Sequence, residues 1–219
     1  SYSDMKTTTL VVSQKYENRI STADWRANQP FLTNFLPLLE NDSYDVNQQK
    51  RIKNNTIDAL FKYYWIVNDF SHLYFVTGNT FIDAKVTSVE KQILSDNTTN
   101  DFFNSGFGNN LDFRFNDAKL GIEYKFLFKK WTTKASLYVH NLDLLTENNG
   151  LENQYSKNVL QPQLESELEL KKGETVTFNY RLTNEFSDFQ MYTNQFQLQN
   201  YQSVFRGNAQ LTEQRQNAY

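Results

Sequence analysis

The sequence predicts an all-β protein, a portion of an antiparallel up-and-down transmembrane β-barrel with short turns on one rim and long loops on the other. Apolar and polar residues alternate over long segments, aromatic residues reach 16% of the chain, and short and long connections alternate. The mean hydropathy of -0.68 agrees with a barrel, because only every second residue of a barrel strand faces lipid. An apolar run of about 18 residues is missing from the sequence, which argues against membrane-spanning helices.

The alternation is clearest in residues 52–68. Apolar and aromatic side chains fill one register from Ile57 to Val67, while Asp58 and Lys62 belong to the other register. This segment is longer than the roughly 9–11 residues that a strand needs to cross a bilayer. The same pattern predicts strands, paired antiparallel in sequence order, over residues 7–20, 52–67, 73–87, 117–128, 131–144, 162–171 and 175–184.

The connections between these strands differ sharply in length. Short turns are predicted at residues 68–72, 129–130 and 171–174. Long loops, rich in amides and hydroxyls, are predicted at residues 21–51, 88–108, 145–160 and 184–210. Short periplasmic turns opposite long extracellular loops are typical of outer-membrane barrels. Trp65, Trp131 and Phe128 lie beside short turns, so we expect them to face outward near one membrane rim.

The long loops contain many aromatic residues. Disordered segments rarely keep so many, so we expect these loops to be ordered, to lie on one rim, and to pack together or against a partner over the barrel mouth. Phe102, Phe103 and Phe107 stand among Asn and Asp residues and are the candidate ligand-binding residues. The alternative is that these rings only pack their own loop.

Composition excludes several function classes. The 22 Lys and Arg residues against 25 Asp and Glu give a net charge of -3, so no nucleic-acid partner is expected. The chain has no cysteine and 2 histidines, and it carries no nucleophile motif such as G-x-S-x-G. We therefore predict no enzyme, no catalytic residue, no metal site and no cofactor. Glu165, Glu167 and Glu169 share one face and are interpreted as a hydrated lumen wall rather than as a calcium site.

A family resemblance is found near the end of the sequence. Residues 206–213 read RGNAQLTE, which resembles the segment G-N-P-x-L-x-P-E of TonB-dependent receptors, especially the large outer-membrane barrel family of Bacteroidetes. The matching residues are Gly207, Asn208, Leu211 and Glu213. Ala209 and Thr212 replace the two prolines, which predicts a less rigid loop. Residues 120–139 and 160–182 resemble hairpins of the same family.

The resemblance implies a 22-stranded barrel in the bacterial outer membrane, closed by an N-terminal plug and energised through TonB. Residues 1–219 are then expected to be an internal or C-terminal part of a single barrel domain, without the plug. Its partners would be outer-membrane lipid, the TonB system through that plug, and a surface lipoprotein. The expected function is the wall and extracellular loops of a nutrient importer.

The alternative is a soluble or surface-attached β-sandwich that binds glycans. Burial distinguishes the two: Phe61, Tyr63 and Trp65 would be exposed in the barrel and hidden in the sandwich.

Overall fold

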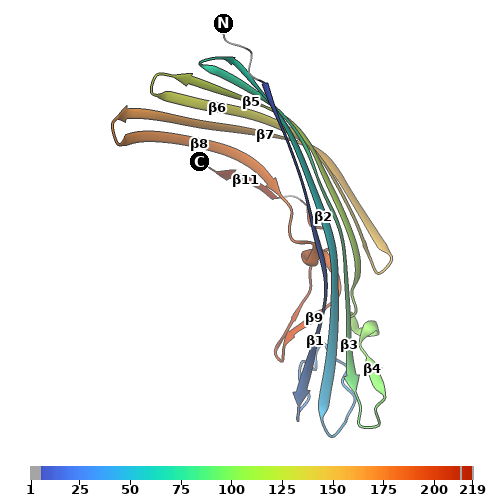
Figure 1. Ribbon diagram of the computed structural model, residues 1–219. Coiled ribbons are helices and arrows are strands. Elements are labelled where there is room, and N and C mark those ends of the chain that lie inside the picture. Colours follow the sequence, from blue (N-terminus) through green and yellow to red (C-terminus); the bar gives the residue numbers. More distant parts are fainter. Residues whose placement is uncertain (1–5, 213, 219) are drawn as a thin grey trace.

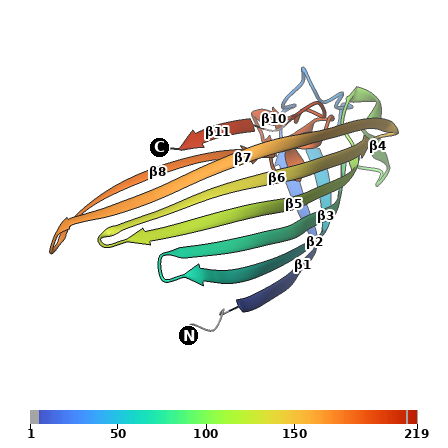
Figure 2. The same ribbon diagram turned by 90° about the horizontal axis from the view of Figure 1, so that it is seen from above.

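The computed structural model describes residues 6–212 and 214–218, and these residues form a curled antiparallel sheet (Figures 1 and 2). The sheet has the strand order β1-β2-β3-β5-β6-β7-β8-β11, with the short β4 paired to β3. Its strands are β1 (Lys6–Ala27), β2 (Tyr44–Asn68), β3 (Ser71–Ile93), β4 (Thr99–Asp101), β5 (Asn110–Phe128), β6 (Trp131–Asn148), β7 (Leu151–Lys171), β8 (Glu174–Glu185) and β11 (Gln214–Ala218). The all-β antiparallel prediction and the pairing in sequence order are confirmed.

The three predicted short turns are confirmed, and they lie together at one end of the sheet (Figure 1). Longer connections cover residues 28–43, 94–109 and 186–213, and the structure describes all of these except residue 213. The last of them contains the 3-10 turn η2 (Phe189–Tyr192) and a small hairpin of β9 (Gln197–Asn200) and β10 (Ser203–Phe205). No described helix is long and apolar enough to span a membrane.

The predicted long loop at residues 145–160 is wrong. β6 continues to Asn148 and β7 begins at Leu151, so only Asn149 and Gly150 connect them. Both residues have positive φ angles, 50° and 81°, as a two-residue hairpin of the Asn-Gly type requires. The polar residues of this region belong to strands that continue past the predicted ends. Residues 21–27, 44–51 and 88–93, also predicted as loop, are strand for the same reason.

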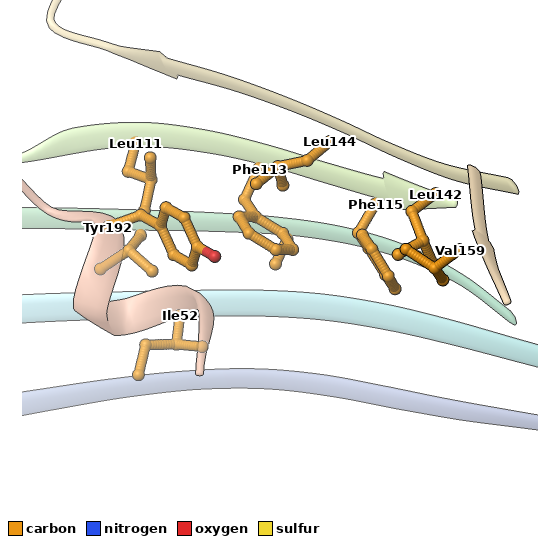
Figure 3. Close-up of a cluster of buried hydrophobic side chains, with 10 residues drawn as sticks. Ile52, Leu111, Phe113, Phe115, Leu142, Leu144, Val159 and Tyr192 are labelled. Carbon is orange, nitrogen blue, oxygen red and sulfur yellow. The ribbon is translucent and has the colours of Figure 1, made fainter. Parts of the chain in front are cut away.

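The long-loop half of the concave face is covered by the chain that follows β8. η2 lies over the sheet, and the Tyr192 ring lies beside Phe113 of β5 (Figure 3). Tyr192 is fully buried, and its ring centroid lies 5.2 Å from that of Phe113. The buried cluster comprises Ile52, Ala84, Val86, Leu111, Phe113, Phe115, Leu142, Leu144, Val159 and Tyr192. We call residues 186–196 the strap, because they cross the concave face.

In the other half of the concave face, Gly121 of β5 makes room for an aromatic ring. Gly121 pairs with Tyr138 of β6, and the Tyr138 ring lies across the glycine. A Cβ atom at residue 121 would stand 2.2 Å from Tyr138 Cδ1, far inside van der Waals contact. Glycine is therefore required here for close packing, and the ring position depends on it.

We expect Gly121→Ala to destabilise the fold by about 1–3 kcal/mol, because the Tyr138 ring must move away. In a Tyr138→Ala background the same change should have an effect below about 0.5 kcal/mol, since the obstructing ring is gone. Urea unfolding of the two single variants and the double variant measures this coupling. Additive effects would show that the ring and the glycine do not compete for space.

Candidate functional site: an apolar belt and a polar inner face

The convex face of the sheet carries an exposed apolar belt around the half nearer the short turns. Every second side chain points to this face, because the register of β1 to β7 is continuous across this region. Its apolar members are Leu10, Val12, Ile57, Ala59, Phe61, Tyr63, Trp65, Val67, Leu73, Phe75, Phe81, Ala118, Leu120, Ile122, Tyr124, Phe126, Phe128, Trp131, Ala135, Leu137, Val139, Leu160, Pro162, Leu164, Leu168, Leu170, Val176, Phe178 and Tyr180. Many of these large side chains are 36–67% exposed. Exposed apolar surfaces of this extent are typical of sites that contact other proteins or membranes.

The belt runs obliquely across the strands. On β2 it extends from Ile57 to Val67, and on β7 from Leu160 to Leu170. Through the pairings of the intervening strands, Leu160 of β7 lies level with Phe61 of β2. Phe61 is four residues closer to the short turns than Ile57, where the belt begins on β2. The belt therefore begins four residues closer to the short turns on β7 than on β2. Four residues correspond to about 13 Å along a strand, and the four strand spacings from β2 to β7 to about 19 Å. The belt is therefore inclined by roughly 35° from the perpendicular to the strands, close to the tilt of about 35–45° in outer-membrane barrels.

The aromatic residues beside the short turns face outward, as predicted. Trp131 is 45% exposed and Phe128 49%, and Trp65 is partly exposed on the same face. Trp131 Nε1 donates a hydrogen bond to Ser166 Oγ at 2.8 Å, so the polar edge of the ring has a partner on the convex face. Phe61 is 39% exposed, and Tyr63 is also accessible. These exposures match the prediction made for a barrel wall and not the one made for a sandwich core.

The concave face opposite the belt is polar and centred on Glu123. This side chain is only 4% exposed, and two ammonium groups neutralise it. Lys62 Nζ lies 3.0 Å from Glu123 Oε1, Lys134 Nζ lies 3.1 Å from Oε2, and the Tyr138 hydroxyl donates to Oε1. A buried carboxylate is tolerated only when paired and hydrogen-bonded in this way. The network joins β2, β5 and β6 on the concave face.

The three glutamates of β7 and both histidines also lie on the concave face. Glu165, Glu167 and Glu169 belong to its register on β7, and Glu165 stands opposite Lys134. His140 Nδ1 lies 2.8 Å from Asp117 Oδ1. His72 contacts the Tyr64 hydroxyl beside a short turn. Among the residues described, no group of three or more His, Asp or Glu side chains could hold a metal ion.

The loops at the other end are ordered and pack together, as predicted for them. We call this packing the loop cluster: its buried core is Leu36, Val46, Phe102, Phe107 and Leu198, which come from three separate loops and β2. Trp25, Phe31 and Phe196 pack against this core. Hydrophobic contact, rather than an external partner, therefore accounts for much of the order in these loops.

The three candidate ligand-binding residues occupy different environments. Phe102 and Phe107 are 0% and 1% exposed in the loop cluster, so their rings pack their own loops. Phe103 is 62% exposed and lines a shallow, mainly apolar groove with Val89 and Asn149. Of the three, Phe103 is the ring that a solute can reach.

The segment with the family resemblance has defined packing. A Cβ atom at Gly207 would stand 2.3 Å from the Met191 carbonyl oxygen, so glycine allows the chain to cross directly over η2. Asn208 donates its backbone N–H to that oxygen at 2.8 Å, and its side chain accepts from Gln210 N at 2.9 Å. Leu211 packs against the buried cluster under the strap. Glu213 lies outside the described residues.

A buried carboxyl group supports the loop end. Glu90 is 2% exposed, and Glu90 Oε1 accepts a hydrogen bond from Gln48 Nε2 at 3.0 Å. Burial raises the pKa of Glu90 above its ordinary value of 4.5, while the bonds from Gln48 and Ser88 and the charge of Lys50 oppose that shift. The folded state consequently binds the proton more tightly than the unfolded state does. Glu90 stabilises most below pH 4.5, and this contribution is lost as the pH rises through the elevated pKa.

We expect the loop cluster to become more protease-sensitive as the pH rises from 4.5 toward 7.5, because the buried Glu90 carboxyl must ionise. Glu90→Gln should weaken this dependence, since the amide has no proton to lose. Limited proteolysis of both proteins with an acid-tolerant protease, corrected for protease activity, measures the difference. Equal pH dependence in the two proteins would assign the effect to other groups.

Comparison with protein-family models and with curated proteins found no match for this chain. The functional argument therefore depends on the geometry of the belt, the inner face and the loop cluster.

Proposed function

We propose that the chain forms part of the wall and the extracellular loops of an outer-membrane β-barrel, in a TonB-dependent-type transporter that takes up a nutrient. In this proposal the belt contacts lipid and the concave face lines the lumen. The loop cluster lies outside the cell and contributes to capture of the nutrient. A plug, the TonB system and a surface lipoprotein are proposed partners beyond these residues.

The inclined belt is the observation that carries the proposal. A membrane is flat, so strands that cross it at an angle must shift their lipid-facing residues stepwise from one strand to the next. The roughly 35° inclination meets this requirement. The belt spans 11 residues of β2, from Ile57 to Val67, and 11 residues of β7, from Leu160 to Leu170. A soluble protein has no reason to align exposed apolar residues along such a line.

The concave face supports the same function. It presents paired charges, of which the Glu123 network is the most buried, and polar lumen positions are usual in outer-membrane barrels. The described groups suggest a hydrated wall rather than a reaction centre, so we propose a transport role without catalysis. The sandwich alternative would need a second sheet over Phe61 and Phe75, yet these rings are 39% and 40% exposed.

Two matched substitutions test the proposal. Ile122 lies near the middle of the belt and is 49% exposed, whereas Val89 lies on the same face in the loop half and is 52% exposed. In a membrane, Ile122→Lys should destabilise the fold by about 2–4 kcal/mol, and Val89→Lys by less than about 0.5 kcal/mol. Urea unfolding of the full chain from lipid vesicles measures both. Equal, small effects at the two sites would contradict lipid contact at the belt.

A further inference from the structure

A cluster of cations lies on the convex face just beyond the belt, on the side of the long loops. Lys53, Lys85 and Arg114 each stand four residues past the last apolar belt residue of their strand, and Arg51 stands two residues beyond Lys53. The register places them on β2, β3 and β5, side by side. We call these four residues the basic patch.

The basic patch brings like charges together without full compensation. Lys53 stands directly opposite Lys85 in the β2–β3 register, an arrangement that is unfavourable by itself. Lys85 Nζ lies 2.9 Å from Asp112 Oδ2, and Arg114 Nε lies 3.6 Å from Asp83 Oδ1. Arg51 Nε donates to Asn18 Oδ1 at 3.4 Å. Within the described chain neither Arg51 nor Lys53 has a carboxylate partner, so two cations are left over.

We infer that the basic patch binds the phosphate of an anionic lipid headgroup in the leaflet next to the long loops. This inference rests on the proposed function, because the belt sets the membrane position. Four residues along a strand inclined by about 35° correspond to a height of roughly 11 Å above the hydrocarbon. The headgroup layer occupies about the first 5–8 Å of that height, and Lys and Arg side chains can extend toward the belt to meet it. The unpaired cations then face phosphate, and the repulsion between Lys53 and Lys85 is relieved.

The position of the patch favours a lipid over a dissolved anion. The concave side of the same strands is packed by Ile52, Val86 and Phe113 under the strap, so the cations lie on an open outer wall and not in a cavity. An open wall gives a small anion few contacts, whereas a lipid is also held by its acyl chains on the belt below.

The experiment uses the full chain in detergent and counts bound phosphatidylglycerol and phosphatidylcholine by native mass spectrometry. The double variant Arg51→Gln/Lys53→Gln removes the two unpaired cations. We expect it to bind phosphatidylglycerol roughly 30-fold more weakly, at about 1 kcal/mol per cation near the surface, with phosphatidylcholine unchanged. The matched control Arg26→Gln/Lys91→Gln removes two charges from the same face nearer the loop tips, and its binding should stay close to wild type.

Each other outcome has a defined meaning. Equal losses in both double variants would overturn the site, because they would reflect net charge alone. Release of the lipid by millimolar inorganic phosphate, at constant ionic strength, would identify a free-anion site and overturn the lipid assignment. If wild-type protein retained no lipid of either kind and stayed dispersed without detergent, the belt proposal itself would fail. Retention of both lipids without a preference between them would overturn only the basic patch.

Discussion

The structure depends on one constraint, the nearly continuous register of long strands whose neighbouring side chains point to opposite faces. In β2, Phe61 lies on the convex face and Lys62 reaches the buried Glu123 on the concave face. A slip of one residue would place lysine on the apolar belt and phenylalanine on the polar wall. The pairing of β2 with β1 and β3 holds this register over nearly the whole strand, with one irregularity near residues 66–68. The belt, the Glu123 network and the basic patch all follow from it.

Much of this arrangement could be predicted from sequence, because alternation is local. The residues from Ile57 to Val67 showed both faces of β2, and Lys129–Lys130 showed a turn. Strand ends in the loop half could not be predicted in the same way, since their convex residues are mostly polar and their concave residues are covered by distant chain. Ile52 and Val86 look like isolated apolar residues until the strap brings Tyr192 over them. Asn149–Gly150 was a detectable hairpin signal that the polar composition of residues 145–160 obscured.

The loop end illustrates how packing changes the meaning of a residue. Phe102, Phe103 and Phe107 are equivalent in sequence, yet two of them form the loop core and only Phe103 remains at the surface. Gly207, Asn208 and Leu211 match the family segment in sequence. In the structure Gly207 and Asn208 contact Met191 of η2, and Leu211 packs against the buried cluster. Their roles depend on contacts between segments, which periodicity cannot reveal. The loop cluster and the strap together pack against the half of the sheet that lies beyond the belt.

Fluorescence quenching by lipids with brominated acyl chains tests the central claim most directly. The chain has 3 tryptophans, of which Trp131 lies on the belt and Trp25 packs against the loop cluster. Two single-tryptophan proteins, with the other two tryptophans changed to phenylalanine, would be placed in vesicles of these lipids. The account predicts strong quenching of Trp131 and little quenching of Trp25. Equal quenching of the two, or no quenching of Trp131, would contradict a membrane-facing belt.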